Sequence, residues 1–507
     1  MPVRLLFSQD ANDRVSALMV SMTLEEKIGQ MTQADYGALK GRVEDVVTYS
    51  LGSVLWGGDT EIPDITARGW AATTADLQAL SARTRLKIPL LLGVDAVHGH
   101  NNVNGAVLFP HNIGLGATRN AALVERVARV TADELTATGI PWDFAPCVAV
   151  ARDERWGRTY ESFGENPELV RELGVAYVKG MQGPRLTDAA SALACVKHYV
   201  GDGGTTGGKD QGNTETDEET LRRIHLPGYV DAIAAGARSI MVSFNQWNGK
   251  KLHGHRYLLT DVLKGELGFK GFLVSDWAAI DQLPGSYKEQ IAASINAGLD
   301  MVMIPNGPGT DKNYQQFITL LTELVKEGVV PQVRIDDAVR RILEAKDAMG
   351  LSDRMSRGQQ ALEMVGSPEH RAVARDAVRQ SLVLLKNSQD LLPLSQNSGR
   401  VHLSGRGADN IGMQCGGWTI IWQGKTGDVV VGGTTIRRAV EQAVGSGTKV
   451  TFSEDGEGVA GADVAIVVVG EDPYAEMFGD RADLRLSAGD SAVIEKIHAS
   501  GVPMVVV

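Results

Sequence analysis

Residues 271–277 read Gly-Phe-Leu-Val-Ser-Asp-Trp, a short apolar run that ends in an acid and an indole. Apolar positions in a run this short indicate a strand that is covered on both faces of its sheet. In parallel α/β proteins, ligands sit at the edge where such strands end. We therefore expect Asp276 at a ligand-binding edge, and it is the best candidate for a nucleophile in the chain.

The first 350 residues or so repeat this alternation of short apolar runs and amphipathic stretches. Helices are predicted between most of the runs, for example over 123–138 and 334–348. Alternating strands and helices predict a parallel sheet, and seven strands over this length favour a (β/α)8-type barrel over an open sheet. No eighth strand stands out, so we expect an irregular barrel. The predicted strands cover residues 52–55, 90–94, 142–145, 193–196, 240–244, 272–275 and 301–304.

Polar residues lie within or directly after five of these predicted strands. They are Asp95 and His98, then Asp143, then Lys197 with His198, then Asn245, and finally Asp276. The carboxyl ends of parallel barrel strands meet at one face of the barrel. One such residue would be unremarkable, but packing alone does not explain five runs in register. The pattern indicates the rim of an active site.

A second α/β pattern follows a stretch, residues 351–370, that loses the rhythm and is predicted to be a linker. The first domain is therefore expected over 1–350 and the second over 371–507. Because the chain stops inside an apolar run, we expect the second domain to be truncated at its C-terminus. Its predicted strands cover 382–386, 401–403, 450–452, 464–469 and 504–507, and its predicted helices cover 370–380, 435–444 and 488–499.

Composition excludes several classes of protein. The net charge of -12 argues against a nucleic-acid partner, since phosphate neutralisation needs a basic surface. No apolar run approaches the roughly 20 residues that span a bilayer, so no membrane partner is expected. Three distant cysteines (Cys147, Cys195 and Cys415) form no metal-spaced pair.

No signal peptide is visible, which leaves the compartment open: periplasmic or secreted if a leader was removed, otherwise cytoplasmic. Nothing indicates the oligomeric state.

A pair of carboxylates that flank a bond can cleave a glycoside. One attacks or activates water, and the other, with a raised pKa, protonates the leaving oxygen. Asp276 suits the first role. The second domain offers Gly-Glu-Asp-Pro-Tyr-Ala-Glu over 470–476, directly after the apolar run 464–469. Composition alone leaves open that Glu471 and Glu476 in this loop are ordinary surface charges.

Six motifs carry a resemblance to a known family. They read Met-Thr-Leu-Glu-Glu-Lys at 22–27, Gly-Val-Asp-Ala-Val-His-Gly at 93–99, Arg-Trp-Gly-Arg-Thr-Tyr-Glu-Ser at 155–162, Lys-His-Tyr-Val-Gly-Asp-Gly-Gly at 197–204, Val-Ser-Asp-Trp at 274–277, and the 470–476 loop. With them the chain resembles glycoside hydrolase family 3, in the branch of β-glucosidases and exo-β-glucan glucohydrolases. The resemblance covers essentially the whole chain in order. It implies a (β/α)8-like TIM barrel followed by an α/β sandwich domain, with the active site between them.

The resemblance implies that Asp276 is the nucleophile and Glu476 the acid/base. Glu476 is preferred to Glu471 because it matches the acid/base position of the family. A retaining enzyme needs its two carboxyl groups roughly 5 Å apart. The second domain would therefore have to pack on the mouth of the barrel.

Four further residues match those that hold the terminal sugar in the family: Asp95, Arg158, Lys197 and His198. A carboxylate can accept from two vicinal hydroxyls, and the cationic side chains can donate to others. The bland alternatives are a strand-end cap for Asp95 and a satisfied strand terminus for Lys197 and His198. For Arg158 the alternative is an ion pair with Asp153 or Glu161.

Aromatic residues supply the remaining candidates. Trp277 and Trp422 are expected to clamp the next sugar unit, as the resemblance implies, with Trp418 and Met303 also at the site. Trp418 and Trp422 are four apart, so a helical core stripe is the alternative, although two glycines before them favour a loop.

We expect a retaining exo-acting β-glucosidase that acts on β-linked glucosides or oligosaccharides and needs no cofactor or metal. A catalytically silent carbohydrate-binding protein is one alternative. A β-xylosidase or β-N-acetylglucosaminidase of the same family is another. Family members of the last type carry a histidine acid/base in the loop after the Lys-His motif, and residues 201–205 offer none. Linkage preference stays open, because Gln282, Phe244 and the loop at 207–214 depart from close relatives.

Overall fold

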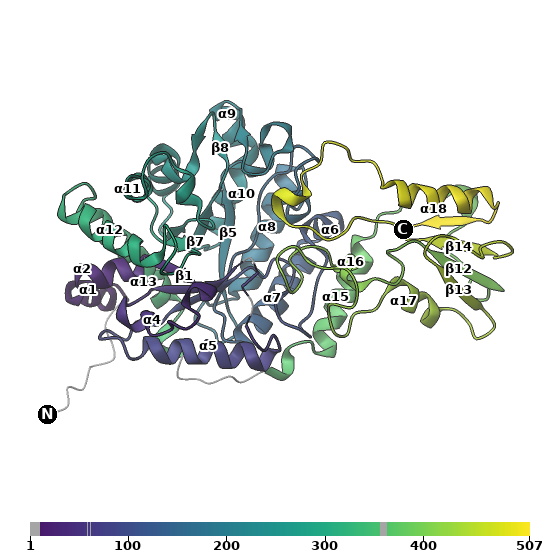
Figure 1. Cartoon of the computed structure of the whole chain (residues 1–507), viewed down its shortest axis with the longest axis horizontal. Coiled ribbons are helices and arrows are strands. Elements are labelled where there is room, and N and C mark those ends of the chain that lie inside the picture. The colour runs from purple at the N-terminus through teal and green to yellow at the C-terminus, as the bar shows by residue number, and fades with distance from the viewer. Residues whose placement is uncertain (1–10, 58, 61, 355–361) are drawn as a thin grey trace. The chain divides into compact units, whose positions relative to one another are not determined.

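The computed structural model describes residues 11–57, 59–60, 62–354 and 362–507. The chain forms two compact units that divide between Ser381 and Leu382 (Figure 1). Each unit is built around its own parallel sheet.

An eight-stranded parallel sheet forms the centre of the first unit, in the order β10-β7-β5-β4-β3-β2-β1-β11. A parallel bridge between Val274 and Met301 links the two strands at its ends, so the sheet nearly closes into the predicted barrel. The strands are β1 (Thr32–Asp35), β2 (Ser53–Trp56), β3 (Leu91–Val94), β4 (Trp142–Asp143), β5 (Leu193–Tyr199), β7 (Ser239–Val242), β10 (Phe272–Val274) and β11 (Val302–Ile304).

Helices follow most of these strands, and the predicted helices at 123–138 and 334–348 are confirmed as α7 and α13. The longer helices are α1 (Ala11–Ser21), α2 (Leu24–Gln30), α5 (Ala67–Ser81), α6 (Asn112–Thr118), α7 (Ala121–Ala137), α8 (Pro167–Gln182), α10 (Pro227–Ala234), η6 (Tyr257–Glu266), α11 (Tyr287–Ala297), α12 (Tyr314–Lys326), α13 (Gln332–Ala348) and α15 (Pro368–Ser381). The shorter ones are α3 (Tyr36–Leu39), α4 (Asp45–Thr48), α9 (Glu218–Thr220), η4 (Leu221–His225) and α14 (Leu351–Arg354). Among the described helices, none is both long and apolar enough to cross a bilayer.

The strand that hydrophobicity did not reveal is β1. Its sequence, Thr-Gln-Ala-Asp, is mostly polar, yet all four residues are buried between β2 and β11. Two of the polar side chains donate hydrogen bonds: the Gln33 amide donates to the Ser53 hydroxyl at 2.8 Å, and the Thr32 hydroxyl donates to the Ile28 carbonyl at 2.9 Å. Hydrogen bonds offset the cost of burying these groups, so this strand needs no apolar run.

Loops that follow β5 and β7 form a small additional sheet. It contains β6 (Asn213–Thr214), β8 (Gln246–Trp247) and β9 (Lys250–Lys251), in the order β6-β8-β9. Because both loops leave the carboxyl ends of barrel strands, this sheet belongs to the same end of the barrel as Asp276.

The second unit has a four-stranded parallel sheet in the order β13-β12-β14-β15. Alternate residues of β14 face opposite layers, since Ile466 packs with Ile436 and Val440 of α17, and Val467 packs with Ile497 of α18. Figure 1 shows the two helices on either side of the sheet. The elements are β12 (Arg400–Ser404), α16 (Ile411–Cys415), α17 (Ile436–Ala443), β13 (Lys449–Ser453), β14 (Val464–Val467), α18 (Ala488–Ala499) and β15 (Met504–Val506).

Four of the five strands predicted for the second unit are present, but the one predicted at 382–386 is wrong. This segment has no strand conformation, and its apolar side chains are exposed, with Leu385 at 91%. Among the described residues, the sheet of this unit consists of β13, β12, β14 and β15 and does not include this segment. A strand is stabilised by hydrogen bonds to a neighbouring strand, and an apolar sequence alone does not supply them.

Candidate functional site

Asp276 lies two residues after β10, at the carboxyl end of the strand, and is only 9% exposed. Its backbone N–H donates to His253 Nε2 at 3.1 Å, and the Trp277 N–H donates to its Oδ1 at 2.7 Å. Its Oδ2 accepts no hydrogen bond from the described residues. One carboxylate oxygen is therefore held by the backbone, and the other is left for an incoming atom.

Burial raises the pKa of Asp276 to about 6, while the Arg158 charge, the Trp277 N–H and the Lys197 charge act in the opposite direction. The nearby Asp95 carboxylate adds to the increase. A carboxyl group with a pKa near 6 is mostly ionised at neutral pH. Asp276 is then a buried anion with one unsatisfied oxygen, which is the state that a nucleophilic carboxylate requires.

Lys197 and Asp95 form a buried ion pair beside Asp276. Lys197 extends from β5, and its Nζ donates to Oδ1 of Asp95, directly after β3, at 2.6 Å. Burial by itself lowers the pKa of Lys197, but attraction to Asp95 and Glu161 outweighs it and raises that pKa above its usual value. The ammonium group therefore stays charged, and the pair presents a donor and an acceptor together.

Arg158 and His198 form the second polar group of the site. The Arg158 guanidinium donates to both Glu161 carboxylate oxygens, at 3.0 and 2.9 Å, and its Nη2 also donates to His198 Nε2 at 3.0 Å. The predicted alternative, an ion pair of Arg158 with Glu161, is thus present and coexists with the contact to His198. His198 Nε2 also lies 3.8 Å from Asp276 Oδ2.

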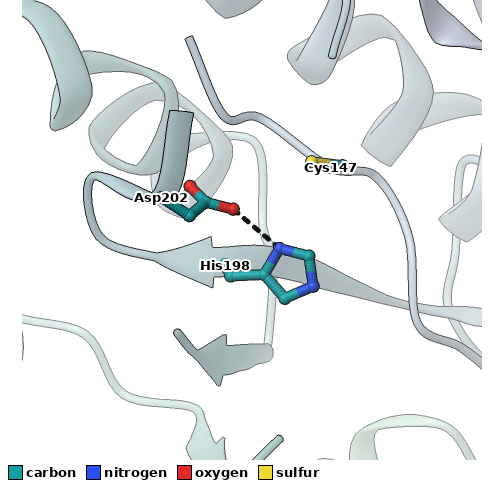
Figure 2. A group of neighbouring side chains, drawn as sticks. All are labelled: Cys147, His198 and Asp202. Atoms are coloured by element: carbon teal, nitrogen blue, oxygen red, sulfur yellow. Dashed lines mark hydrogen bonds and ion pairs between the residues drawn. The ribbon is translucent and has the colours of Figure 1, made fainter. Parts of the chain in front are cut away.

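These contacts fix the tautomer of His198. Because Nε2 accepts from Arg158, the ring proton belongs on Nδ1, which donates to Asp202 Oδ2 at 2.9 Å (Figure 2). Burial, with the charges of Arg158 and Lys197, lowers the pKa of His198 well below its usual value. The imidazole is therefore neutral, and it orients Arg158 without adding charge.

Cys147 faces the same pair, and its Sγ and the ligand atoms of His198 and Asp202 lie within 4.8 Å of one another (Figure 2). A cysteine, a histidine and an aspartate can ligate a soft cation. Burial raises the pKa of the Cys147 thiol far above its usual value, and two cationic side chains, Arg158 and Lys197, lie beside the group. A protonated thiol and neighbouring positive charge both oppose metal binding here.

Trp277 follows Asp276 directly, and Met303 lies in the neighbouring strand β11. The Met303 N–H donates to the Ser275 hydroxyl at 2.8 Å, which ties β11 to the residue before Asp276. The Trp277 ring passes directly over Gly57, where an added Cβ would stand 2.5 Å from a ring carbon. A glycine at that position leaves room for the indole beside Asp276.

Two further residues support this site: Asp143, which the strand-end pattern placed at the rim, and His253, which no sequence motif singled out. His253 accepts the Asp276 backbone N–H at 3.1 Å. Asp143 accepts the Ala96 N–H at 3.0 Å and so holds the segment after Asp95. Burial raises the pKa of Asp143 to about 8.

The remaining sequence candidates lie in the second unit. Glu476 begins the 3-10 turn η10 (Glu476–Gly479) and is half-buried. The Gln423 amide donates to the Ala475 carbonyl at 3.3 Å and accepts the Ala475 N–H at 3.0 Å, so the Trp422 loop clamps the Glu476 loop. The Trp422 ring meets Phe478 edge-on, with ring centroids 5.8 Å apart.

Trp418 is buried, and its backbone N–H donates to the Trp422 backbone carbonyl at 2.8 Å. Its φ of 62° and the 66° of Ile420 are not helical. The alternative of a helical core stripe over Trp418 and Trp422 is therefore wrong. Glu471 is paired with Arg481 at 3.1 Å and accepts the Tyr474 hydroxyl at 2.7 Å.

The structure thus divides the candidate residues between its two units. The first unit gathers Asp95, Arg158, Lys197, His198, Asp276, Trp277 and Met303 around the strand ends of one barrel. The second unit holds Glu476, Trp422 and Trp418 on neighbouring loops.

Comparison with known proteins gives two family matches. The model described as "Glycosyl hydrolase family 3 N terminal domain" matches residues 23–345, and the one described as "Glycosyl hydrolase family 3 C-terminal domain" matches residues 382–507. The chain is 34% identical to a "Lysosomal beta glucosidase" of Dictyostelium discoideum, over 97% of this chain and 65% of that protein. It is 30% identical to a "Periplasmic beta-glucosidase" of Salmonella typhimurium, over 97% of this chain and 67% of that protein.

Two solved structures are also similar. An exo-1,3/1,4-beta-glucanase from a Pseudoalteromonas species is 43% identical with a TM-score of 0.93, over 99% of this chain and 64% of that one. A beta-glucosidase from Listeria innocua in complex with glucose is 28% identical with a TM-score of 0.85, over 98% of this chain and 69% of that one. The chain spans about two thirds of the length of these relatives.

Proposed function

Because the chain belongs to glycosyl hydrolase family 3, we propose that it is a retaining, exo-acting β-glucosidase. It releases glucose from the non-reducing ends of β-glucans, cello-oligosaccharides or aryl glucosides. The observation that carries this proposal is the state of Asp276: buried, anchored through one oxygen and unsatisfied at the other.

The reaction has two displacements at one carbon. Asp276 Oδ2 attacks the anomeric carbon, the bond to the leaving oxygen breaks, and Glu476 gives that oxygen a proton. Glu476 then takes a proton from water, whose oxygen attacks the anomeric carbon and releases Asp276. For this the two carboxyl groups must approach to about 5 Å across the sugar. The side chains supply both the nucleophile and the proton, so the mechanism uses no metal or organic cofactor.

The preference for Glu476 over Glu471 has support within the second unit. The Glu471 carboxylate is bound by Arg481 and by the Tyr474 hydroxyl. These two contacts hold the Glu471 carboxylate within its own loop, against Arg481 and Tyr474. Glu476 shares its loop with Ala475, which Gln423 holds beside Trp422.

The charged groups around Asp276 are suited to glucose hydroxyls. The Lys197 and Asp95 pair offers a donor and an acceptor side by side. A hydroxyl that enters next to Asp276 Oδ2 meets His198 Nε2 and Arg158 Nη2, which lie 3.0 Å apart. Trp277, Trp422 and Trp418, with Met303, are proposed to border the site for the leaving group.

A substrate panel tests this function. The purified chain is expected to hydrolyse p-nitrophenyl β-glucoside at least about tenfold faster than the matching xyloside or N-acetylglucosaminide, since one well-placed hydroxyl contact contributes on the order of 1 kcal/mol or more. Laminaribiose, cellobiose, gentiobiose and xylobiose then rank the linkages. Proton NMR should show β-glucose as the first product. An α-anomer formed first, or glucose binding without turnover, would reject the retaining enzyme.

The pH dependence is predicted from Asp276. The free enzyme has a nucleophile with a pKa of about 6, and only the ionised form attacks. We therefore expect kcat/KM to decline as pH falls through about 6, approaching a tenfold loss per pH unit. Initial rates with the aryl glucoside give the profile, and circular dichroism at each pH confirms that the protein is folded. A constant kcat/KM down to about pH 4.5 would contradict the assignment.

A further inference from the structure

A pocket of about 680 Å³ lies on the barrel outside the site described above. Its walls come from the loop after β11, the first turns of α12 and the first residue of α11. Because this loop leaves the carboxyl end of β11, it belongs to the same end of the barrel as Asp276, which follows the neighbouring β10. The pocket volume is within the range of ligand sites.

A short path connects this pocket to the nucleophile. Lys312, in the pocket wall, donates from Nζ to the Asp281 carbonyl at 3.1 Å. Asp281 lies in the turn η7 (Ala279–Gln282), four residues after Trp277, so their backbones are at most about 14 Å apart. In an exo-acting enzyme the rest of a glucan chain leaves the site past the aglycone residue Trp277. The pocket is within reach of that chain.

The walls offer groups that suit hydroxyls and sugar faces. Asp311 is exposed, and its carboxylate has no hydrogen-bond partner among the described residues. Gln316 is exposed, and its side-chain oxygen accepts the Asn313 backbone N–H at 3.4 Å. Its side-chain NH₂ group makes no hydrogen bond to the described residues. Tyr287 adds a ring and a hydroxyl. Hydroxyl-rich ligands are bound by such mixed donors and acceptors together with an aromatic surface.

Charge narrows the class of ligand. The wall carries one acid, Asp311, and one base, Lys312. These opposite charges favour neither a polyanion nor a polycation. A second pocket, of about 570 Å³, differs in this respect, since four of its residues are cationic: Arg256, Lys264, Arg334 and Arg341. The first pocket is the one that fits a neutral, hydroxyl-rich chain.

We propose that the pocket at Tyr287, Asp311, Lys312 and Gln316 is a secondary binding site for a neutral β-glucan chain whose end is in the active site. The choice of a β-glucan as the ligand rests on the proposed function. The site holds the polymer at the rim of the barrel, so it raises the affinity for long glucans and leaves small glucosides unaffected.

The test compares binding and hydrolysis in matched variants. The double variant Asp311→Ala/Gln316→Ala removes two exposed polar groups, and Gln332→Ala, an exposed glutamine on α13, is the control. Binding is measured by native gel electrophoresis in laminarin, with each change placed in an Asp276→Asn background so that the polymer is not degraded. Pullulan, an α-glucan, is the control polymer. Melting temperatures verify that each variant is folded.

We expect the double variant to bind laminarin at least about fivefold more weakly, equivalent to about 1 kcal/mol, and the control variant to bind normally. With Asp276 intact, kcat/KM for p-nitrophenyl β-glucoside should stay within about twofold, since one sugar does not reach the pocket. Tyr287→Phe, which removes only a hydroxyl, is expected to weaken laminarin binding in the same direction.

Unchanged laminarin binding in the double variant overturns this proposal, whatever the chain does to aryl glucosides. Pullulan retention that equals laminarin retention overturns it too, because the pocket would not select β-glucans. A chain that hydrolyses no β-glucoside but loses laminarin binding in the double variant retains the secondary site and rejects the catalytic proposal. The two proposals therefore fail separately.

Discussion

Replacement of Asp276 by Asn is expected to lower kcat for aryl β-glucosides at least about a thousandfold, equivalent to about 4 kcal/mol of transition-state stabilisation. A neutral amide cannot form the glycosyl ester through which a retaining enzyme works. Asn has nearly the shape of Asp, and its side-chain oxygen can still accept the Trp277 N–H that now binds Oδ1. Initial rates with p-nitrophenyl β-glucoside measure the loss.

Folding of this variant is not expected to suffer. Burial raises the pKa of Asp276 from 3.8 to about 6, so folding favours the protonated carboxyl group. The corresponding stability is present at low pH and is lost as pH rises from about 4 through about 6. An amide at this position keeps the neutral state at every pH. The melting temperature of the variant at neutral pH should therefore be no lower than that of the parent.

Asp143→Asn is the matched control for Asp276→Asn. Asp143 lies in the same barrel, is fully buried and has a pKa that burial raises to about 8, so it is mostly protonated at neutral pH. An amide oxygen can replace its contact with the Ala96 N–H. We expect this variant to keep activity within about tenfold. An Asp276→Asn enzyme with more than a few per cent of the parent kcat would reject Asp276 as the nucleophile.

The second large effect is expected for Glu476→Ala, and it depends on the leaving group. Without the general acid, hydrolysis of cellobiose should slow by about 10²–10⁴-fold, because a sugar alkoxide is a poor leaving group. A dinitrophenyl glucoside needs no proton to leave, so the first step should change little. Added azide is an anionic nucleophile that needs no general base, so it is expected to attack the anomeric carbon of the glycosyl ester in place of water, release the Asp276 carboxylate and give β-glucosyl azide. Rates on both substrates, with and without azide, test the role.

Glu471→Gln is the control for this loop. Its carboxylate binds Arg481 and the Tyr474 hydroxyl, so its loss should alter the loop without selecting between leaving groups. If Glu476→Ala slows both substrates equally and yields no glucosyl azide, Glu476 is not the acid/base. A leaving-group dependence that appears in the Glu471 variant instead would reassign the role to Glu471.

Strands with apolar runs were predictable, and strands without them were not. The run over 271–277 identified β10 because both faces of that strand are buried in apolar contacts. β1 is as deeply buried, but Gln33 and Thr32 donate hydrogen bonds that no local sequence pattern reveals. The opposite error occurred at 382–386, where apolar sequence alone suggested a strand that has no partner among the described residues.

The same distinction applies to the site. The positions of Asp95, Lys197 and Asp276 were predictable, because Asp95 and Asp276 follow strands of a parallel barrel and Lys197 lies near the end of such a strand, within β5. The contacts that tune them were not, since His253 and Cys147 reach the site through long-range packing and lie in no recognisable motif. The roles proposed for Glu476 and Trp422 came from the family motifs, because no strand-end pattern singles out these two loop residues.

The most direct test of the central claim is to trap the covalent intermediate. The parent chain is treated with a 2-deoxy-2-fluoroglucosyl fluoride and digested, and the labelled peptide is sequenced by mass spectrometry. The fluorine at carbon 2 slows both formation and hydrolysis of the ester, but the good leaving group restores its formation, so the ester accumulates. We predict one fluoroglucosyl group on Asp276 and time-dependent loss of activity. A label on another carboxylate, or inactivation without a glycosyl ester, would contradict the account.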